Sequence, residues 1–125
     1  MKGLFQFIIV MLFIVLFING CSHGKSEEVT VYEMKSFSEV DEDSITTFAD
    51  LKDINLLVTA FHNAKKEPGI VNMIDPEYKV ELRNDSYFLW INEEHGTIMN
   101  LKDTHTIYTL SEKSTKKIYE LLKGK

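Results

Sequence analysis

The fold is decided by residues 78–110, which read YKVELRNDSYFLWINEEHGTIMNLKDTHTIYTL. This stretch alternates apolar and polar side chains and is rich in β-branched and aromatic residues, a pattern typical of strands with one buried face. Turn-forming residues interrupt it at Asn84-Asp85, at Glu94-His95-Gly96 and at Asp103-Thr104. The stretch therefore predicts an antiparallel β-meander of about four strands joined by short turns.

The turn lengths also predict the register of these strands. A two-residue turn at Asn84-Asp85 pairs Val80 with Leu89. A left-handed Gly96 in the next turn pairs Leu89 with Leu101. One face of the sheet then collects the apolar side chains Tyr78, Val80, Leu82, Tyr87, Leu89, Ile91, Met99, Leu101, Tyr108 and Leu110. A shift of one residue would scatter them over both faces, so their agreement supports this register.

The same register predicts a candidate binding surface on the opposite face. It places Lys79 opposite Trp90 and Glu81 opposite Phe88. The surface comprises Trp90, Phe88, Lys79, Arg83, Ile98 and Ile107. Apolar side chains within a polar frame can mark a binding site, with Trp90 as its anchor. Alternatively, the C-terminal helix or the first strand covers these side chains.

The chain before this stretch predicts a strand and a long helix. Residues from Val29 to Phe37 alternate and favour a strand. An acidic loop over residues 39–44 is expected to follow. Residues 48–64 carry apolar side chains at helical spacing, which predicts a helix that ends before Pro68-Gly69.

After the meander, Ser111 is a suitable N-cap for a final helix that extends to about Lys123. The predicted fold class is therefore α+β, with an N-terminal strand, a long helix, an antiparallel β-meander of about four strands and a C-terminal helix. Residues 29–125 are long enough for one such domain with a modest core.

The first twenty residues are typical of a signal peptide. Lys2 supplies a short positive region, and twelve consecutive apolar residues follow from Phe7 to Ile18. This run is too short to cross about 30 Å of hydrocarbon comfortably as a permanent helix, but it suits a secretory signal.

The end of the apolar run predicts a lipoprotein. Ile18-Asn19-Gly20-Cys21 resembles a lipobox, with Asn19 as a departure from the usual small or apolar residue. Cleavage is expected between Gly20 and Cys21, after a diacylglycerol is attached to the thiol. Two acyl chains of the palmitate type anchor a protein durably, whereas one binds a membrane marginally. Residues 21–28 would form a lipidated flexible tether, because Ser22 to Glu28 are small and polar.

The charge of the chain argues against nucleic acid as a partner. Residues 1–20 contain one lysine and no acid, so residues 21–125 carry 13 basic and 19 acidic side chains and a net charge of −6. A negative chain repels phosphate backbones. The expected partners are the membrane, through the diacylglycerol on Cys21, and another envelope protein.

No motif predicts an enzyme, a metal or a cofactor. His23, His62, His95 and His105 lack the close spacing of zinc ligands,. Residues 39–43 are acidic but lack the glycine and the distant glutamate of a calcium loop. The only cysteine is the expected lipidation site, and no Gly-x-Ser-x-Gly sequence occurs,.

Four stretches of the chain resemble one protein family, namely PGIVN (68–72), YFLWI (87–91), GTIM (96–99) and DTHTIYTLS (103–111). From about Ile45 to Leu122 the chain is similar to the YhfM-like domain of small lipoproteins in Bacillus-type bacteria. The resemblance implies a Gram-positive envelope and a place on the outer face of the cell membrane. It supplies no catalytic residue.

The expected function is that of a membrane-anchored extracytoplasmic lipoprotein that binds a protein or envelope ligand without catalysis. Two alternatives remain open. One is a small envelope-associated hydrolase, and the other is a structural or chaperone-like role in wall assembly or sporulation.

Overall fold

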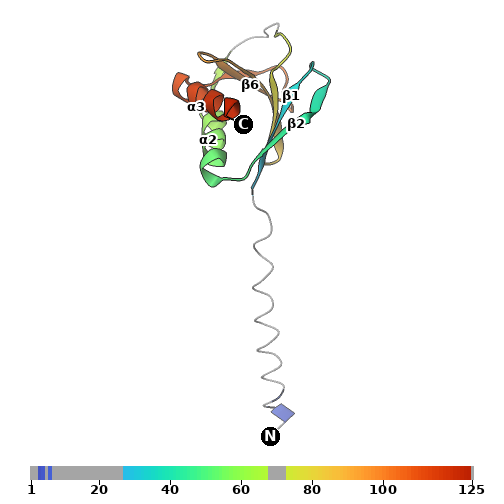
Figure 1. Cartoon of the computed structure of the whole chain (residues 1–125). Helices are drawn as coiled ribbons and strands as arrows, with labels where there is room; N and C mark the ends of the chain where they lie inside the picture. The colour runs from blue at the N-terminus through green and yellow to red at the C-terminus, as the bar shows by residue number, and fades with distance from the viewer. Residues whose placement is uncertain (1–2, 5, 7–26, 68–72, 125) are drawn as a thin grey trace.

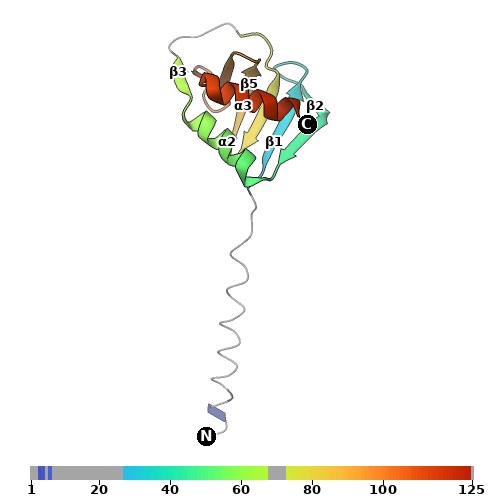
Figure 2. The same ribbon diagram turned by 60° about the vertical axis from the view of Figure 1, so that its left-hand side comes forward.

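A computed structural model describes residues 3–4, 6, 27–67 and 73–124. The described residues form one seven-stranded antiparallel sheet with two helices on the same face (Figures 1 and 2). The elements are β1 (Val29–Met34), β2 (Val40–Phe48), α2 (Leu51–His62), β3 (Lys65–Glu67), β4 (Tyr78–Leu82), β5 (Asp85–Ile91), β6 (Gly96–Asn100), β7 (Ile107–Thr109) and α3 (Glu112–Lys123). The strands lie in the order β2-β1-β4-β5-β6-β7-β3.

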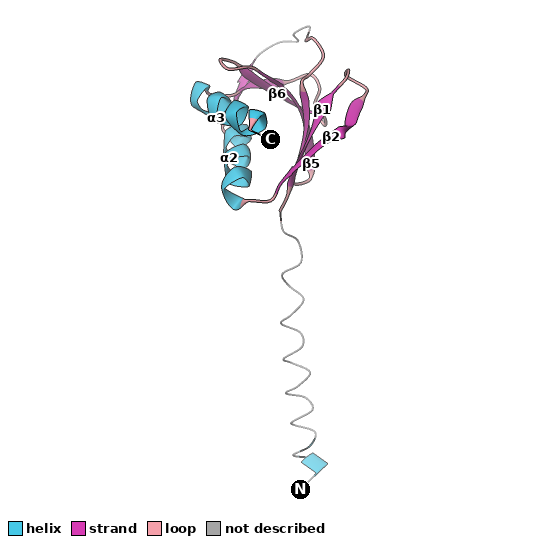
Figure 3. Ribbon diagram, viewed as in Figure 1, coloured by secondary structure: helices cyan, strands magenta, loops and turns pink. Residues whose placement is uncertain are grey.

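The predicted α+β arrangement of an N-terminal strand, a long helix, an antiparallel β-meander of about four strands and a C-terminal helix is wrong. The sheet is larger because β1, β2 and β3 join the strands of residues 78–110 in one layer (Figure 3). Helix α2 is also shorter than the expected span 48–64, because Asp50 is its N-cap. Asp50 Oδ1 accepts a hydrogen bond from Lys52 N at 2.9 Å. Phe48 belongs to β2, and the chain enters β3 at Lys65.

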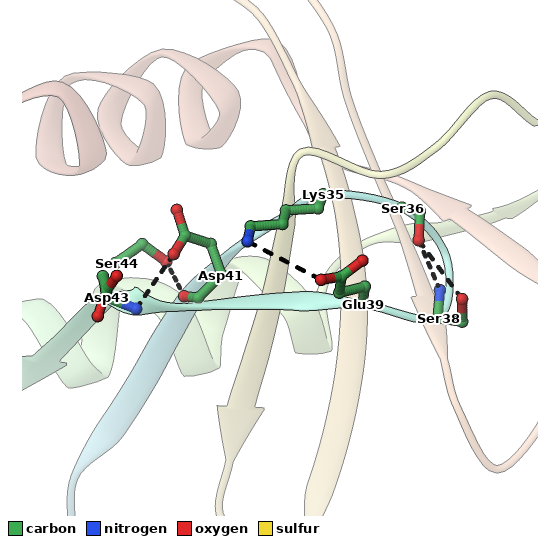
Figure 4. Close-up of polar contacts among 7 residues, drawn as sticks. All are labelled: Lys35, Ser36, Ser38, Glu39, Asp41, Asp43 and Ser44. Atoms are coloured by element: carbon green, nitrogen blue, oxygen red, sulfur yellow. Dashed lines mark hydrogen bonds and ion pairs between the residues drawn. The ribbon is translucent and has the colours of Figure 1, made fainter.

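The acidic segment predicted as a loop belongs to the edge strand β2. Its carboxylates stay in solvent there, which an edge strand allows. Glu33 pairs with Asp41 and Val31 with Thr46, so residues 42–45 bulge out opposite Tyr32. The Ser44 hydroxyl accepts a hydrogen bond from Glu33 N at 2.8 Å, and the Asp41 carboxylate accepts one from Asp43 N at 3.1 Å. Figure 4 shows this bulge beside the Lys35–Glu39 ion pair of the β1–β2 turn.

The turn of the β4–β5 hairpin lies one residue earlier in the chain than predicted, which shifts the pairing of the two strands by two residues. Its turn residues are Arg83 and Asn84, and Arg83 has a φ of 56°. Tyr78 pairs with Leu89 instead of Ile91. This shift is two residues long, so it leaves the predicted apolar side chains of both strands on the core side.

The β5–β6 register differs by three residues, and this odd shift turns β6 over. Leu89 pairs with Ile98 instead of Leu101, so Ile98 enters the core and Met99 faces outward. The turn comprises residues 92–95 and begins two residues earlier than predicted. In it the Asn92 carboxamide accepts hydrogen bonds from Glu94 N at 2.9 Å and His95 N at 2.8 Å. Gly96 then begins β6 and does not adopt the predicted left-handed conformation.

The core lies between the sheet and the two helices. In α2, the side chains of Ile54, Leu57, Ala60 and Phe61 are buried. The predicted N-cap of the final helix is confirmed, because Ser111 Oγ accepts a hydrogen bond from Ser114 N at 3.1 Å and α3 buries Ile118. The sheet contributes Val29, Val31, Phe48, Val80, Leu82, Leu89, Ile91 and Ile98, and Leu110 joins them from the link to α3.

We expect a chain that begins at Val29 to keep the fold. Val29 is the first residue of β1 and is buried, whereas residues 27–28 are exposed. Among the described residues that precede Val29, Glu27 forms an exposed ion pair with Arg83, and such pairs add little stability,. Deleting residues 1–28 should therefore leave the thermal midpoint within a few degrees of the midpoint of a chain that begins at Ser22. Loss of a cooperative transition in scanning calorimetry would show that residues 22–28 belong to the folded unit.

Candidate functional site

Trp90 is not the exposed anchor that the candidate binding surface requires. It lies on the outer face of β5 but is only 7% exposed. Its indole Nε1 donates a hydrogen bond to the Ile74 carbonyl oxygen at 2.7 Å. The cover comes from residues 73–77 and from Phe37, the last residue of the predicted first strand, which the structure places in the β1–β2 turn. The C-terminal helix, the other alternative, lies on the opposite face of the sheet (Figures 1 and 2).

Phe37, Phe88 and Trp90 form an aromatic cluster on this outer face. The ring centroids of Phe37 and Phe88 are 5.9 Å apart, those of Phe37 and Trp90 6.2 Å, and those of Phe88 and Trp90 6.1 Å. The edge-to-face geometry of two of these pairs is favourable for aromatic rings. Phe88 and Trp90 come from one strand, and Phe37 reaches them from the turn between β1 and β2.

Residues 73–77 are held against this cluster by hydrogen bonds that backbone N–H groups of the sheet and of the β1–β2 turn donate. The Asp75 carboxylate accepts one from Phe37 N at 3.3 Å. Glu77 accepts two, one from Met34 N to its carbonyl at 2.9 Å and one from Ile91 N to its carboxylate at 3.1 Å. Two apolar side chains of this region still face solvent, since Phe37 is 42% and Ile74 75% exposed. We call these two residues the apolar patch.

The apolar patch lies at the end of the sheet that carries three acidic segments. The pairs Glu33–Tyr78 and Tyr78–Leu89 place the β1–β2 turn, residues 73–77 and the β5–β6 turn at this same end. These segments carry five carboxylates, which we call the acidic rim, namely Glu39, Asp75, Glu77, Glu93 and Glu94. The only lysine in these segments, Lys35, lies 3.8 Å from Glu39.

The other residues of the predicted surface are dispersed. Lys79 lies opposite Phe88 rather than Trp90, and its Nζ is 3.9 Å from Glu81. Arg83 lies in the turn at the other end of the sheet, where its Nε is 3.6 Å from Glu27. Ile98 belongs to the core because β6 is turned over, and Ile107 is buried. Gly20 and Cys21 lie outside the described residues.

The described residues offer little to catalysis or to metal binding. No group of three histidine, cysteine or carboxylate side chains that could hold a metal occurs among them. His62, His95 and His105 are exposed and come from α2 and two separate turns. Burial raises the pKa of Tyr78 and Tyr87, and burial beside Glu81 raises the pKa of Tyr32, so these phenols stay protonated at neutral pH.

Sequence reasoning missed the two exposed residues of this site. Phe37 was placed at the end of a strand, although its flanking serines, Ser36 and Ser38, indicate a turn,. Ile74 precedes Asp75-Pro76, a turn signal that also predicts exposure,. What the sequence could not reveal is the hydrogen bond that brings Ile74 onto Trp90, since it joins residues sixteen positions apart in the chain.

No helix among the described residues is long and apolar enough to cross a membrane.

Comparison with known proteins places the chain in a family. No curated protein and no solved structure matches the chain significantly. The model of one family, described as YhfM protein, matches residues 25–125. This range includes all seven strands of the sheet and the helices α2 and α3. This chain belongs to the YhfM family.

Proposed function

We propose that this protein is an extracytoplasmic lipoprotein of the cell membrane and that its domain is a non-catalytic binding module. The observation that carries the first part is the order of residues 7–21. Twelve apolar residues lead into Ile18-Asn19-Gly20-Cys21, and Cys21 is the only cysteine of the chain. A lone cysteine at this position has no disulfide partner within the chain. It follows an apolar run and Gly20, as a lipidated cysteine does, and Asn19 is the one departure from the usual pattern.

The binding role is supported by the apolar patch. Single exposed apolar residues are common on protein surfaces. Phe37 and Ile74, however, are linked by hydrogen bonds. Phe37 N donates to the carboxylate of Asp75, and the Ile74 carbonyl oxygen accepts from the Trp90 indole, whose ring lies beside Phe88 and Phe37. Grouped apolar side chains within a polar frame are typical of interaction sites. The patch replaces the surface centred on Trp90, which the structure buries.

The anchor is tested by replacing the lipidated atom. We expect Cys21→Ala to abolish incorporation of a radiolabelled fatty acid, because the thiol is the attachment point, and to leave an unprocessed precursor of higher mass. Metabolic labelling followed by immunoprecipitation measures both effects. Ser22→Ala is the matched control, since it changes the adjacent residue and should keep full labelling. Equal labelling of the parent chain and the Cys21→Ala chain would refute the lipoprotein assignment.

A further inference from the structure

We infer that the apolar patch and its acidic rim bind a basic segment of a partner protein, one that presents an aliphatic or aromatic side chain between lysine or arginine residues. This inference deepens the proposed function and rests on it. It names the chemistry of the partner and the residues that contact it.

The apolar half of the site is ordered before any partner binds. The Phe37 ring packs on Phe88 and Trp90, and its backbone N–H donates to Asp75. The backbone of Ile74 is fixed by the Trp90 indole. Because Phe37 and Ile74 are already ordered, binding of a partner side chain to them costs little conformational entropy on this side of the interface.

Charge identifies the partner as basic. The acidic rim places five carboxylates at the same end of the sheet as the patch. The two lysines nearby are already paired: Lys35 lies 3.8 Å from Glu39, and Lys79, opposite Phe88, lies 3.9 Å from Glu81. The adjoining part of β2 adds Asp41, Glu42 and Asp43, so the acidic field continues along that edge. A field of one sign attracts partners of the opposite sign and repels its own, which disfavours an anionic lipid or polymer at this site.

The position of the patch favours a protein over the membrane that holds the anchor. The chain enters the domain at Val29, the first residue of β1, at the lower end of the sheet in Figure 1. Phe37 and Ile74 belong to the β1–β2 turn and to residues 73–77, which lie at the other end of that strand. A strand of this length separates the two ends by roughly 20 Å. Pairing along β2 is also disfavoured, because the bulge at residues 42–45 interrupts that edge,. The partner segment therefore docks on side chains and adds no strand.

The test uses the full chain in nanodiscs of neutral lipid and a fluorescent synthetic peptide with leucines between lysines. Fluorescence polarisation should show binding that weakens as salt is raised. Ile74→Ser should weaken binding about tenfold, as loss of a central apolar contact does. Glu93→Gln with Glu94→Gln should weaken it about threefold through the lost charge. Leu51→Ser is the matched control, because Leu51 is 69% exposed on α2 and should leave binding unchanged.

Several outcomes would overturn the inference. Equal binding of a peptide with glutamate in place of lysine would exclude charge recognition, and equal binding by the Ile74→Ser chain would exclude the patch. Absence of binding at millimolar peptide would exclude the partner class. Binding of the full chain in its neutral nanodisc to separate phosphatidylglycerol vesicles without peptide, or dimerisation of the chain in analytical ultracentrifugation, would assign the patch to lipid or to self-association if Ile74→Ser abolished it. Cys21 labelling is measured separately, so a lipidated chain that binds no peptide refutes this inference alone.

Discussion

Replacing Trp90 by alanine is expected to lower the free energy of unfolding by about 3–5 kcal/mol, as removal of a buried aromatic side chain does. The indole is 7% exposed, contacts the rings of Phe37 and Phe88, and donates to the Ile74 carbonyl at 2.7 Å. Its removal opens a cavity and also breaks the hydrogen bond to Ile74. Urea denaturation followed by circular dichroism gives the change directly.

Two further variants separate packing from the hydrogen bond. Trp90→Phe keeps a ring in place but loses the bond to Ile74, which should cost about 1 kcal/mol beyond the small loss of packing. Leu51→Ala is the surface control, and a change under about 0.5 kcal/mol is expected. In the parent chain the single tryptophan should emit at short wavelength and resist quenching by iodide. A cost below about 1 kcal/mol for Trp90→Ala would show that the indole lies in solvent.

The sequence predicted those parts of the fold that depend on neighbours in the chain. The N-cap at Ser111 is such a case, because its hydroxyl bonds a backbone N–H three residues away. The inward face of β4 and β5 is another, since Val80, Leu82 and Leu89 alternate within their strands. The two-residue error in the predicted β4–β5 register left that alternation intact,.

Features that depend on one side chain in a turn, or on distant segments, were predicted wrongly. The β5–β6 turn spans residues 92–95, where the Asn92 carboxamide accepts two hydrogen bonds, and the resulting register exchanges Ile98 and Met99 between the two faces. The strand β2 was taken for a loop because its acids suggested solvent, and an edge strand meets that requirement equally well. The cover over Trp90 comes from residues 37 and 74, which no local pattern connects to it.

Gly96 is the last residue whose role the sequence misassigned, and its replacement should have a large effect. An alanine Cβ at Gly96 would lie 2.8 Å from Leu110 Cδ1 and 2.9 Å from Thr115 Oγ1. Leu110 is 4% exposed and Thr115 fully buried, so neither has room to move away. Gly96→Ala should therefore lower the free energy of unfolding by about 1–3 kcal/mol, the usual cost of an overpacked core, and Gly96→Val by more. Urea denaturation of both variants measures the trend with side-chain size.

A compensating substitution makes the contact itself testable. The Thr115 hydroxyl is buried and has no hydrogen-bond partner in the described structure, so Thr115→Ala removes the clashing oxygen without breaking a hydrogen bond. The double variant Gly96→Ala with Thr115→Ala should be more stable than the sum of the two single losses predicts, because the two positions touch. Gly124→Ala is the matched glycine control, since a Cβ there lies 3.4 Å from its nearest atom at the end of α3. If Gly96→Ala and Gly124→Ala cost the same, the close approach of Leu110 and Thr115 does not limit residue 96. If the Gly96 and Thr115 losses simply add, the contact with Thr115 does not contribute.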